Sequence, residues 1–400
     1  MRNRVYSGTY SLEHWMNLLR TGNIILPKYQ RHFVWEKERV DKLVQSIKDE
    51  LFIPPVTIGS FKKDGKIQNL ILDGQQRLTS ILLAYLGIYP DKEHYQRIDE
   101  VTLATETEGT EEESDDEEPM VIKWNVNELL DKDNNYDAIM ERVRRNGHYH
   151  SFQRTIDDEI LKNHFLGFNY LVPETKNPIE MQRYFSSVFR SVNYSGMNLL
   201  PQESRKALYY LDSHYEQYFA PDFCERITVA NRKVKGKVIM DFTRALALIT
   251  AYHHTNDYHK VGKGYGRRLE VYYEHFIQNV VSGDYEDTFG KITDVFADGK
   301  YSSVMEKLKN QINNLGFFRH FESIIYVDVF LMGLIYYVVF KKEEIDVTRK
   351  NDLTAVLTAK AEDFKRNDKH SKSPASLKYL QARMEESIKI YEDYVQKHDL

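Results

Sequence analysis

Apolar and polar positions in the first ninety residues follow a pattern that predicts a mixed α/β unit. Apolar residues at helical spacing, with charged residues between them, predict a helix over 40–51, and the proline pair at 54–55 ends it. A shorter helix is expected over 11–20, where Ser11 is a favourable N-cap residue, and an apolar strand over 24–26. Helix and strand signals therefore interleave from the start of the chain.

A hairpin and a further helix complete this unit. Strands are expected over 56–58 and 66–72, joined around Asp64-Gly65, a dipeptide typical of hairpin turns. Apolar residues at 78, 81, 82 and 85 then predict an amphipathic helix that ends at Gly87, a good C′ residue. The order helix, strand, helix, hairpin, helix is a mixed α/β pattern and not a doubly wound one.

The chain is mostly helical by period from about residue 127 onward. A helix is expected from Pro178 to about Val192, followed by a turn over 193–196 and another helix from Pro201. Beyond 221, amphipathic stretches predict an all-helical part, over 238–254, 268–281, 301–313, 317–342 and 375–396. The expected fold class is α+β, with a small mixed α/β domain followed by a larger, mainly α-helical domain.

Composition and charge narrow the class of protein. A chain of 400 residues with 42% hydrophobic residues is globular, and it is long enough for two domains. The net charge of −5 argues against a protein that coats nucleic acid non-specifically, although a local basic groove stays open. Glu106 to Glu118 holds nine acidic and no basic residues, and we expect a solvated, disordered loop there rather than a DNA-mimicking element.

Cysteine content and apolar runs indicate a cytoplasmic protein. The single cysteine, Cys224, excludes an intramolecular disulfide framework and a Cys-rich zinc module. The N-terminus lacks the apolar segment of a signal peptide. The longest apolar run, Val327 to Phe340, is interrupted by Asp328 and is shorter than the about 20 residues that span a bilayer. We expect a buried helix there and no membrane contact.

The segment Asp73-Gly74-Gln75-Gln76-Arg77 joins an expected strand to an amphipathic helix. The first turn of a helix has unpaired N–H groups and the positive end of the dipole, so it attracts anions. Gly74 lets a ligand approach the backbone, Gln75 and Gln76 add donors, and Arg77 can grip phosphate oxygens with its planar fork. These residues predict a phosphate site.

A structural interpretation also fits this segment. Asp73 is a favoured N-cap residue, and Arg77 lies four residues on, at the spacing of a helix-surface ion pair. A bare carboxylate beside phosphates is repulsive. In a phosphate site Asp73 must therefore cap the helix, hold a divalent cation or position a water molecule.

A second polar and aromatic cluster lies between the first expected strand and the helix over 40–51. Tyr29, Phe33 and Trp35 can stack a base, while Gln30 and Arg31 can reach phosphate or ribose. The alternative is that the aromatic residues fill the gap between helix and sheet, and for Trp35 this packing role is favoured. Packing explains Gln30 and Arg31 less well, because both are polar beside an apolar junction.

Together these segments closely resemble the N-terminal-domain family of GmrSD-type restriction endonucleases. The resemblance covers about residues 8 to 90 without a gap and resumes at 189–203. The occurrence of all these segments together and in this order is far more specific than any one motif. The matching segments are Leu26-Pro27-x-Tyr29-Gln30-Arg31-x-Phe33-x-Trp35, Leu43-Val44-Gln45-Ser46-Ile47, Ile53-Pro54-Pro55, Asp73-Gly74-Gln75-Gln76-Arg77-Leu78-Thr79, Phe189-Arg190-Ser191-Val192-Asn193-Tyr194-Ser195-Gly196-x-x-Leu199 and Glu203.

The resemblance implies a ParB/sulfiredoxin-like fold that binds and helps to hydrolyse nucleoside triphosphates, in defence against foreign DNA. By matching position, Asp73, Gln76 and Arg77 are expected to be catalytic, with Asp73 as the candidate metal ligand. Asn193 and Gly196 form a secondary motif. The expected nucleotide-binding residues are Tyr29, Gln30, Arg31, Gly74, Gln75 and Thr79.

A nuclease signature is missing from the pattern. In such systems an HNH nuclease, which needs histidines to activate water and hold a metal, accompanies the nucleotide-hydrolysing part. His253, His254 and His259 lie at the end of a helical stretch without strand context, where histidines are usually structural, and His320 and His370 add no signature. We therefore expect the nuclease to be absent or on a partner.

Basic stretches offer contacts to DNA. The preferred candidate is the crowded turn at 232–237, with Arg232, Lys233, Lys235 and Lys237 as expected phosphate contacts. The stretches 142–145 and 264–268 are alternatives, and a solvated surface is the simpler explanation for each.

The expected layout is a ParB-like nucleotide-binding domain over 1–97, an acidic flexible loop over 98–120, a helical extension with the second motif over 121–220 and an all-helical domain over 221–400. The leading hypothesis is a Mg²⁺-dependent nucleoside triphosphatase of a restriction-like system. Its expected partners are a nucleotide, DNA and a separate nuclease subunit, and a homodimer stays open. The alternatives are a nucleotide-switched DNA- or partner-binding module with little hydrolysis, and a metal-dependent DNA nuclease.

Overall fold

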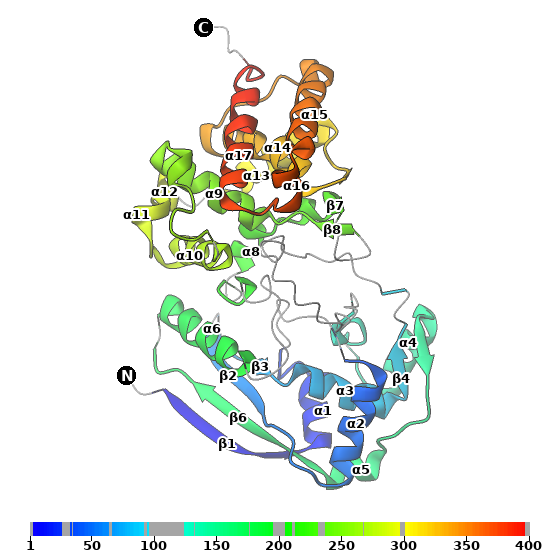
Figure 1. Ribbon diagram of the computed structural model, residues 1–400. Helices are drawn as coiled ribbons and strands as arrows, with labels where there is room; N and C mark the ends of the chain where they lie inside the picture. Colours follow the sequence, from blue (N-terminus) through cyan, green and yellow to red (C-terminus); the bar gives the residue numbers. More distant parts are fainter. Residues whose placement is uncertain are drawn as a thin grey trace. The chain divides into compact units, whose positions relative to one another are not determined.

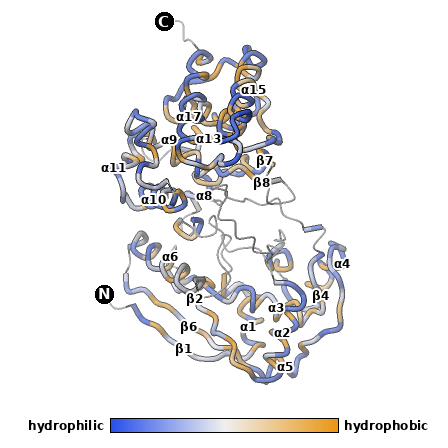
Figure 2. The backbone as a smooth tube through the Cα atoms, in the orientation of Figure 1, coloured by the Kyte–Doolittle hydropathy of each residue, from blue (hydrophilic) through white to orange (hydrophobic). Residues whose placement is uncertain are grey.

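The chain folds into two compact units (Figure 1). The computed structural model describes residues 3–25, 33, 35–63, 66–91, 94–95, 124–131, 133–175, 177–194, 205–209, 213–230, 237–266, 268–296 and 301–396. Unit 1 comprises Met1–Arg97 with Asp115–Leu199, and unit 2 comprises Ile98–Ser114 with Leu200–Leu400. Each unit has a hydrophobic core of its own. In Figure 2 hydrophobic (orange) and hydrophilic (blue) residues alternate along the helices of both units, as amphipathic packing requires.

Unit 1 is built on a four-stranded mixed sheet. Its strands are β1 (Arg4–Ser11), β6 (Phe165–Val172), β2 (Val56–Lys63) and β3 (Lys66–Asp73), in the spatial order β1-β6-β2-β3. The neighbours β1 and β6 are antiparallel, as are β2 and β3, whereas β2 and β6 run parallel. The hairpin expected around residues 64–65 is therefore confirmed as the pairing of β2 with β3.

Three helices bury their apolar stripes on one face of this sheet. They are α1 (Leu12–Arg20), α2 (Lys37–Lys48) and α3 (Gln75–Leu86), and their buried residues share one core with Ile58 and Ile71. Because neighbouring residues of a strand point to opposite faces, Gly59 and Leu72 lie on the other side. There Phe185 of α6 (Pro178–Tyr194) packs so closely on Gly59 that a β-carbon would lie 2.6 Å from its ring.

The remaining elements of unit 1 flank this arrangement. The short strands β4 and β5 pair with each other in a separate two-stranded sheet. The elements are β4 (Ile88–Pro90), η2 (Val126–Glu128), α4 (Tyr136–Asn146), β5 (Tyr149–Ser151) and α5 (Asp158–Asn163).

Unit 2 is mainly helical. Its helices are α8 (Ser213–Phe219), η3 (Asp222–Arg226), α9 (Phe242–Thr255), η4 (Tyr258–Lys260), α10 (Leu269–Ser282), α11 (Glu286–Phe289), α12 (Ile292–Val295), α13 (Ser302–Leu315), α14 (Ile324–Ile335), the π-helical η6 (Tyr336–Lys341), η7 (Val347–Arg349), α15 (Lys350–Arg366), α16 (Asp368–Lys372) and α17 (Leu377–Glu392). The expectation of an all-helical part is wrong in one respect. Three short strands, β7 (Thr228–Ala230), β8 (Lys237–Ile239) and β9 (His320–Phe321), form a small sheet in the order β8-β7-β9.

Helix α14 is the central element of unit 2. Together with η6 it spans Ile324–Lys341, 18 residues that are 94% buried, and among the described helices it is the one long and apolar enough to cross a membrane. The expected buried helix is thus confirmed. The hydroxyl of Ser387 on α17 inserts into its hydrogen-bond ladder, because Oγ accepts from Gly333 N and donates to Val329 O, each at 2.7 Å.

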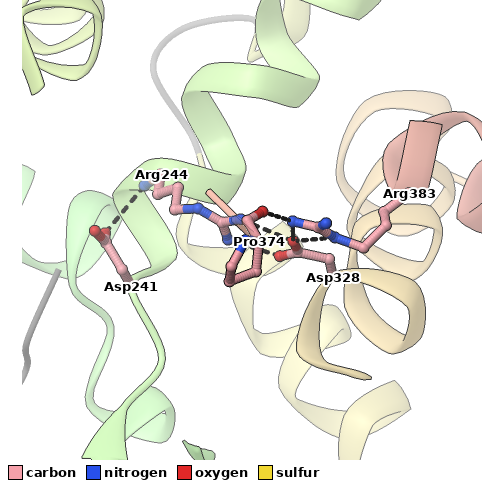
Figure 3. A network of polar contacts seen from close by, with 5 residues as sticks. All are labelled: Asp241, Arg244, Asp328, Pro374 and Arg383. Atoms are coloured by element: carbon pink, nitrogen blue, oxygen red, sulfur yellow. Dashed lines mark hydrogen bonds and ion pairs between the residues drawn. The ribbon is translucent and has the colours of Figure 1, made fainter. Parts of the chain in front are cut away.

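A buried ionic network joins three helices of unit 2 (Figure 3). Asp328 of α14 accepts hydrogen bonds from Arg244 of α9 and from Nε of Arg383 of α17, the latter at 2.9 Å. Arg383 also donates to the carbonyl of Pro374, and Asp241 caps α9 by accepting from Arg244 N at 3.0 Å. All charged groups of the network are removed from solvent, so each depends on its partners.

The expected fold class, α+β with a larger mainly helical second part, is confirmed. Two local expectations are wrong. The segment 121–220, expected as a helical extension, supplies β6 to the main sheet. The turn expected over 193–196 does not start at 193, because α6 continues to Tyr194. The acidic stretch 106–118 lies outside the described residues.

Candidate functional site

The candidate site begins where β3 meets α3. Asp73 is the last residue of β3 and pairs with Thr57 of β2. Gly74 is the N-cap of α3, with φ 98° and ψ 4°, and the helix begins at Gln75. The cap position expected for Asp73 is therefore taken by Gly74, because the strand extends one residue further than the apolar pattern indicates. The carboxylate of Asp73 instead accepts a hydrogen bond from the guanidinium of Arg77.

Glycine at position 74 is required both by the backbone and by space. A φ of 98° is the left-handed region, which residues with a β-carbon rarely adopt. A β-carbon there would lie 2.9 Å from Cγ2 of Val56 and 3.1 Å from Nη2 of Arg77. The turn is thus packed tightly against the start of β2 and against the guanidinium of Arg77.

Asp73 and Arg77 form an ion pair. Nη2 of Arg77 donates to Oδ2 of Asp73 at 2.5 Å and to the carbonyl of Pro55 at 3.3 Å. The exposed fractions of the two side chains are 14% for Arg77 and 25% for Asp73, so the pair is partly shielded from water. The ion pair expected under the structural interpretation is therefore present. Pro55 was part of the sequence pattern, but its residue type did not indicate that its backbone carbonyl would accept a hydrogen bond from Arg77.

The first turn of α3 leaves backbone N–H groups ahead of the helix hydrogen-bond ladder. Its first helix hydrogen bond runs from Leu78 N to Gly74 O at 3.0 Å, so the N–H groups of the residues between them precede the ladder. No acidic residue lies within this turn. Gln75 is 8% exposed, and its side chain makes no hydrogen bond within the described residues. Thr79, one turn further on, is buried.

Several expected site residues lie outside the described part of the chain. This set comprises Tyr29, Gln30, Arg31, Gly196, Arg232, Lys233 and Lys235. Only the backbone is described for Asn193, within α6, and for Lys237, at the start of β8. The structure therefore brings together the residues 73–77 of the expected pocket, and the facing segment stays a prediction.

Two aromatic residues of the second cluster, Phe33 and Trp35, pack in or against the core of unit 1. Phe33 is buried, with ring centroids 6.0 Å from Tyr89 and 5.6 Å from Trp124. The guanidinium of Arg39 lies 4.6 Å from the ring centroid of Trp35, whose carbonyl accepts a hydrogen bond from Tyr89 at 2.6 Å. For Trp35 the packing alternative describes these contacts.

The histidines considered for a nuclease do not form a metal cluster. Among the described residues, no group of three or more His, Cys, Asp or Glu side chains is placed to hold a metal ion. His253 and His254 occupy the last turn of α9, and His259 lies in η4. Burial lowers the pKa of His253, and Lys341 and Lys342 lower it further. This imidazole is therefore neutral at neutral pH.

Comparisons with known proteins give one extended match. The family model described as GmrSD restriction endonuclease, N-terminal domain, matches residues 12–210. An uncharacterized protein of Methanocaldococcus jannaschii is 30% identical over 84 residues, which cover 16% of this chain and 14% of that protein. The chain thus spans far less than two thirds of that relative. No solved structure matches the chain.

Proposed function

Residues 12–210 belong to the GmrSD restriction endonuclease N-terminal domain family, and from this premise we propose that the chain is the nucleotide-handling subunit of a DNA restriction system. It binds a nucleoside triphosphate at the start of α3, on a ParB/sulfiredoxin-like domain, and hydrolyses it with Mg²⁺. The observation that carries the proposal is the junction of β3 and α3. There Gly74, which has no β-carbon to keep a ligand away, precedes α3, and the first turn of α3 holds no acidic residue.

The phosphate groups interact with the first turn of α3. The backbone N–H groups of the first turn and the positive end of the helix dipole attract negative charge. The backbone of Gly74 can approach a phosphate oxygen directly, since no β-carbon stands between them. These preorganised donors act on the charge that develops on the transferred phosphoryl group.

Asp73 fits the role of a single carboxylate in a magnesium site. Mg²⁺ keeps several waters and is held by one or two carboxylates together with phosphate oxygens. Oδ2 of Asp73 is bonded to Arg77, while the structure gives Oδ1 no hydrogen bond within the described residues. Oδ1 would hold the ion or a water molecule beside the phosphates. When bound, the ion would neutralise the charge that develops on the phosphate oxygens.

Cleavage of DNA is assigned to a separate nuclease subunit. This part of the proposal is supported by the location of His253 and His254 in the last turn of α9 and of His259 in η4. DNA itself would contact basic residues, with 232–237 as the preferred segment. We place the chain in the cytoplasm, and the burial of α14 within unit 2 supports this location.

The test is release of phosphate from each of the four common nucleoside triphosphates, with and without DNA and Mg²⁺. Wild type is compared with Asp73→Asn, which keeps the shape of the side chain, and with Asp137→Ala, an exposed aspartate at the start of α4. We expect turnover by wild type and by the Asp137 variant, and its loss in Asp73→Asn. Turnover that does not require Mg²⁺ would contradict the proposed chemistry.

Calorimetric titration with the same nucleotides separates binding from hydrolysis. Binding without turnover, with an affinity for DNA that changes when nucleotide is added, would replace hydrolysis by a ParB-like switch. Plasmid cleavage by the chain alone, lost in Asp73→Asn and independent of nucleotide, would instead select the nuclease alternative. If wild type neither binds nor hydrolyses any of the four nucleotides, with or without DNA, the proposed function is wrong.

A further inference from the structure

The guanidinium of Arg77 is held within unit 1 by two strand ends and a turn. Nη2 donates to Oδ2 of Asp73 at 2.5 Å and to the carbonyl of Pro55 at 3.3 Å, so both of its N–H bonds have protein acceptors. A β-carbon on Gly74 would lie 3.1 Å from the same nitrogen. Arg77 thus links the end of β3, the start of β2 and the first turn of α3.

This arrangement removes the planar grip that arginine normally offers to phosphate. A guanidinium binds an oxyanion with two parallel N–H bonds, either from Nη1 and Nη2 or from Nε and Nη2. Both pairs contain Nη2, which is already bonded to Asp73 and Pro55. Nε is buried without a hydrogen-bond partner, and the side chain is only 14% exposed. A two-point contact with phosphate would require the ion pair to break.

The same ion pair neutralises the negative charge of Asp73 at the proposed phosphate site. Asp73 directly precedes Gly74, the N-cap of α3, so this carboxylate is close in the chain to any phosphate bound at the first turn. An unpaired carboxylate there would repel phosphate oxygens, and two like charges a few ångströms apart at a partly buried site repel by several kcal/mol. A guanidinium bonded to Asp73 cancels this repulsion without touching the ligand.

We infer that Arg77 is a positioning residue, which neutralises and orients Asp73 so that a phosphate chain can occupy the N-terminus of α3 beside it. The inference rests on the proposed function, since it assigns a role within the same site. It differs from the expectation that Arg77 grips the phosphates itself. If Arg77 bound the phosphates directly, its replacement would remove one of their contacts. If Arg77 neutralises Asp73, its replacement leaves the phosphates beside an unpaired, repelling carboxylate.

A double-mutant cycle separates these two roles. The probe is inorganic tripolyphosphate, titrated calorimetrically into the full chain in the presence of EDTA, so that neither a base nor a metal ion contributes. The proteins are wild type, Arg77→Gln, Asp73→Asn and the double variant. We expect Arg77→Gln to weaken binding about tenfold or more, because it leaves an unpaired carboxylate beside the phosphates. The double variant should return to within about threefold of wild type, since the repelling charge is gone.

A matched control is the pair Glu385–Lys389 on α17, which has the same spacing of four residues. Glu385→Gln and Lys389→Gln, singly and together, should leave binding unchanged. The melting temperature of each variant checks that it folds. If Arg77→Gln does not fold, Arg77→Lys is used in its place. Lysine keeps a positive charge beside Asp73, so binding should stay within about threefold of wild type.

Three outcomes overturn the inference. A double variant as weak as Arg77→Gln would mean that Arg77 contacts the phosphates directly. An Arg77→Gln variant that binds like wild type would mean that the pair has no influence on the ligand. A tenfold loss in Arg77→Lys would show that charge neutralisation is not the role of Arg77. Failure of wild type to bind tripolyphosphate or any nucleoside triphosphate would instead contradict the proposed function.

Discussion

The carboxylate of Asp328 accepts two hydrogen bonds from the guanidinium of Arg244, at 2.6 and 2.8 Å, between α14 and α9 in the core of unit 2 (Figure 3). Burial alone raises the pKa of Asp328, but Arg244 and then Arg383 outweigh it, and the net shift is downward. Asp328 is therefore charged in the folded protein, and the two arginines depend on it. Asp328 thus links α14 to both α9 and α17.

Replacing Asp328 by Ala should strongly destabilise unit 2. The change leaves two buried guanidinium groups without their carboxylate, and loss of one partner from a buried ionic group costs about 3–5 kcal/mol. Urea unfolding of wild type and variant measures the difference. The control is Glu306→Ala, which breaks the exposed pair with Lys309 and should cost less than about 1 kcal/mol. A loss below about 1 kcal/mol for Asp328→Ala would contradict the role given to the network.

Glu270 should make the stability of unit 2 depend on pH. Burial raises its pKa from 4.5 to about 7, against the opposing effect of Arg205, whose Nε lies 3.5 Å away. The Glu270 carboxyl binds its proton more tightly in the folded state than in the unfolded state, so protonation of Glu270 stabilises the folded protein. Stability contributed by this group is present at low pH and is lost as the pH rises from about 4.5 to about 7.

The variant Glu270→Gln mimics the protonated form at every pH. We expect it to be more stable than wild type at pH 8, by about 1–3 kcal/mol, since one pKa unit corresponds to about 1.4 kcal/mol. At pH 4, below the unfolded pKa of 4.5, the difference should nearly vanish. Melting curves at both values test this, with Glu286→Gln as the control at an exposed position. A variant less stable than wild type at pH 8 would show that the Arg205–Glu270 attraction dominates.

Gly74→Ala should destabilise unit 1 and weaken nucleotide binding together. The β-carbon adds strain at φ 98° and meets Val56 at 2.9 Å, so we expect a cost of about 1–3 kcal/mol. Gly22→Ala is the matched control, because Gly22 has φ +68° but nothing within 4 Å of the position that a β-carbon would take. The difference in unfolding free energy between the two variants isolates crowding from backbone strain. Equal costs would mean that the close packing at Gly74 contributes nothing.

The helices of unit 1 were predictable because their signals are local. Ser11 caps α1 by accepting from His14 N at 3.2 Å, and Gly87 ends α3 in the left-handed conformation, as their residue types indicated. The strands β1 and β6 were not predicted. Their pairing joins Tyr6 to Tyr170, far apart in the chain, and β6 alternates too weakly between apolar and polar residues to reveal its partner.

The candidate site was predictable in its residues but not in its bonding. The Asp73–Arg77 spacing indicated an ion pair, and the pair is present. The extent of β3 decided that Gly74, and not Asp73, is the cap residue. The contact of Arg77 with the carbonyl of Pro55 depends on the pairing of β2 with β3, and a tertiary backbone contact of this kind leaves no trace in residue type.

The hydroxyl of Ser387 within the ladder of α14 has a consequence for the order in which unit 2 is made. Gly333 N and Val329 O lie early in the chain relative to α17, which supplies the group that bonds both of them. During synthesis α14 emerges from the ribosome before α17, so its apolar surface is then uncovered. Only when α17 has been translated can Ser387 bridge Gly333 N and Val329 O, so this local form of α14 depends on a segment made more than fifty residues later.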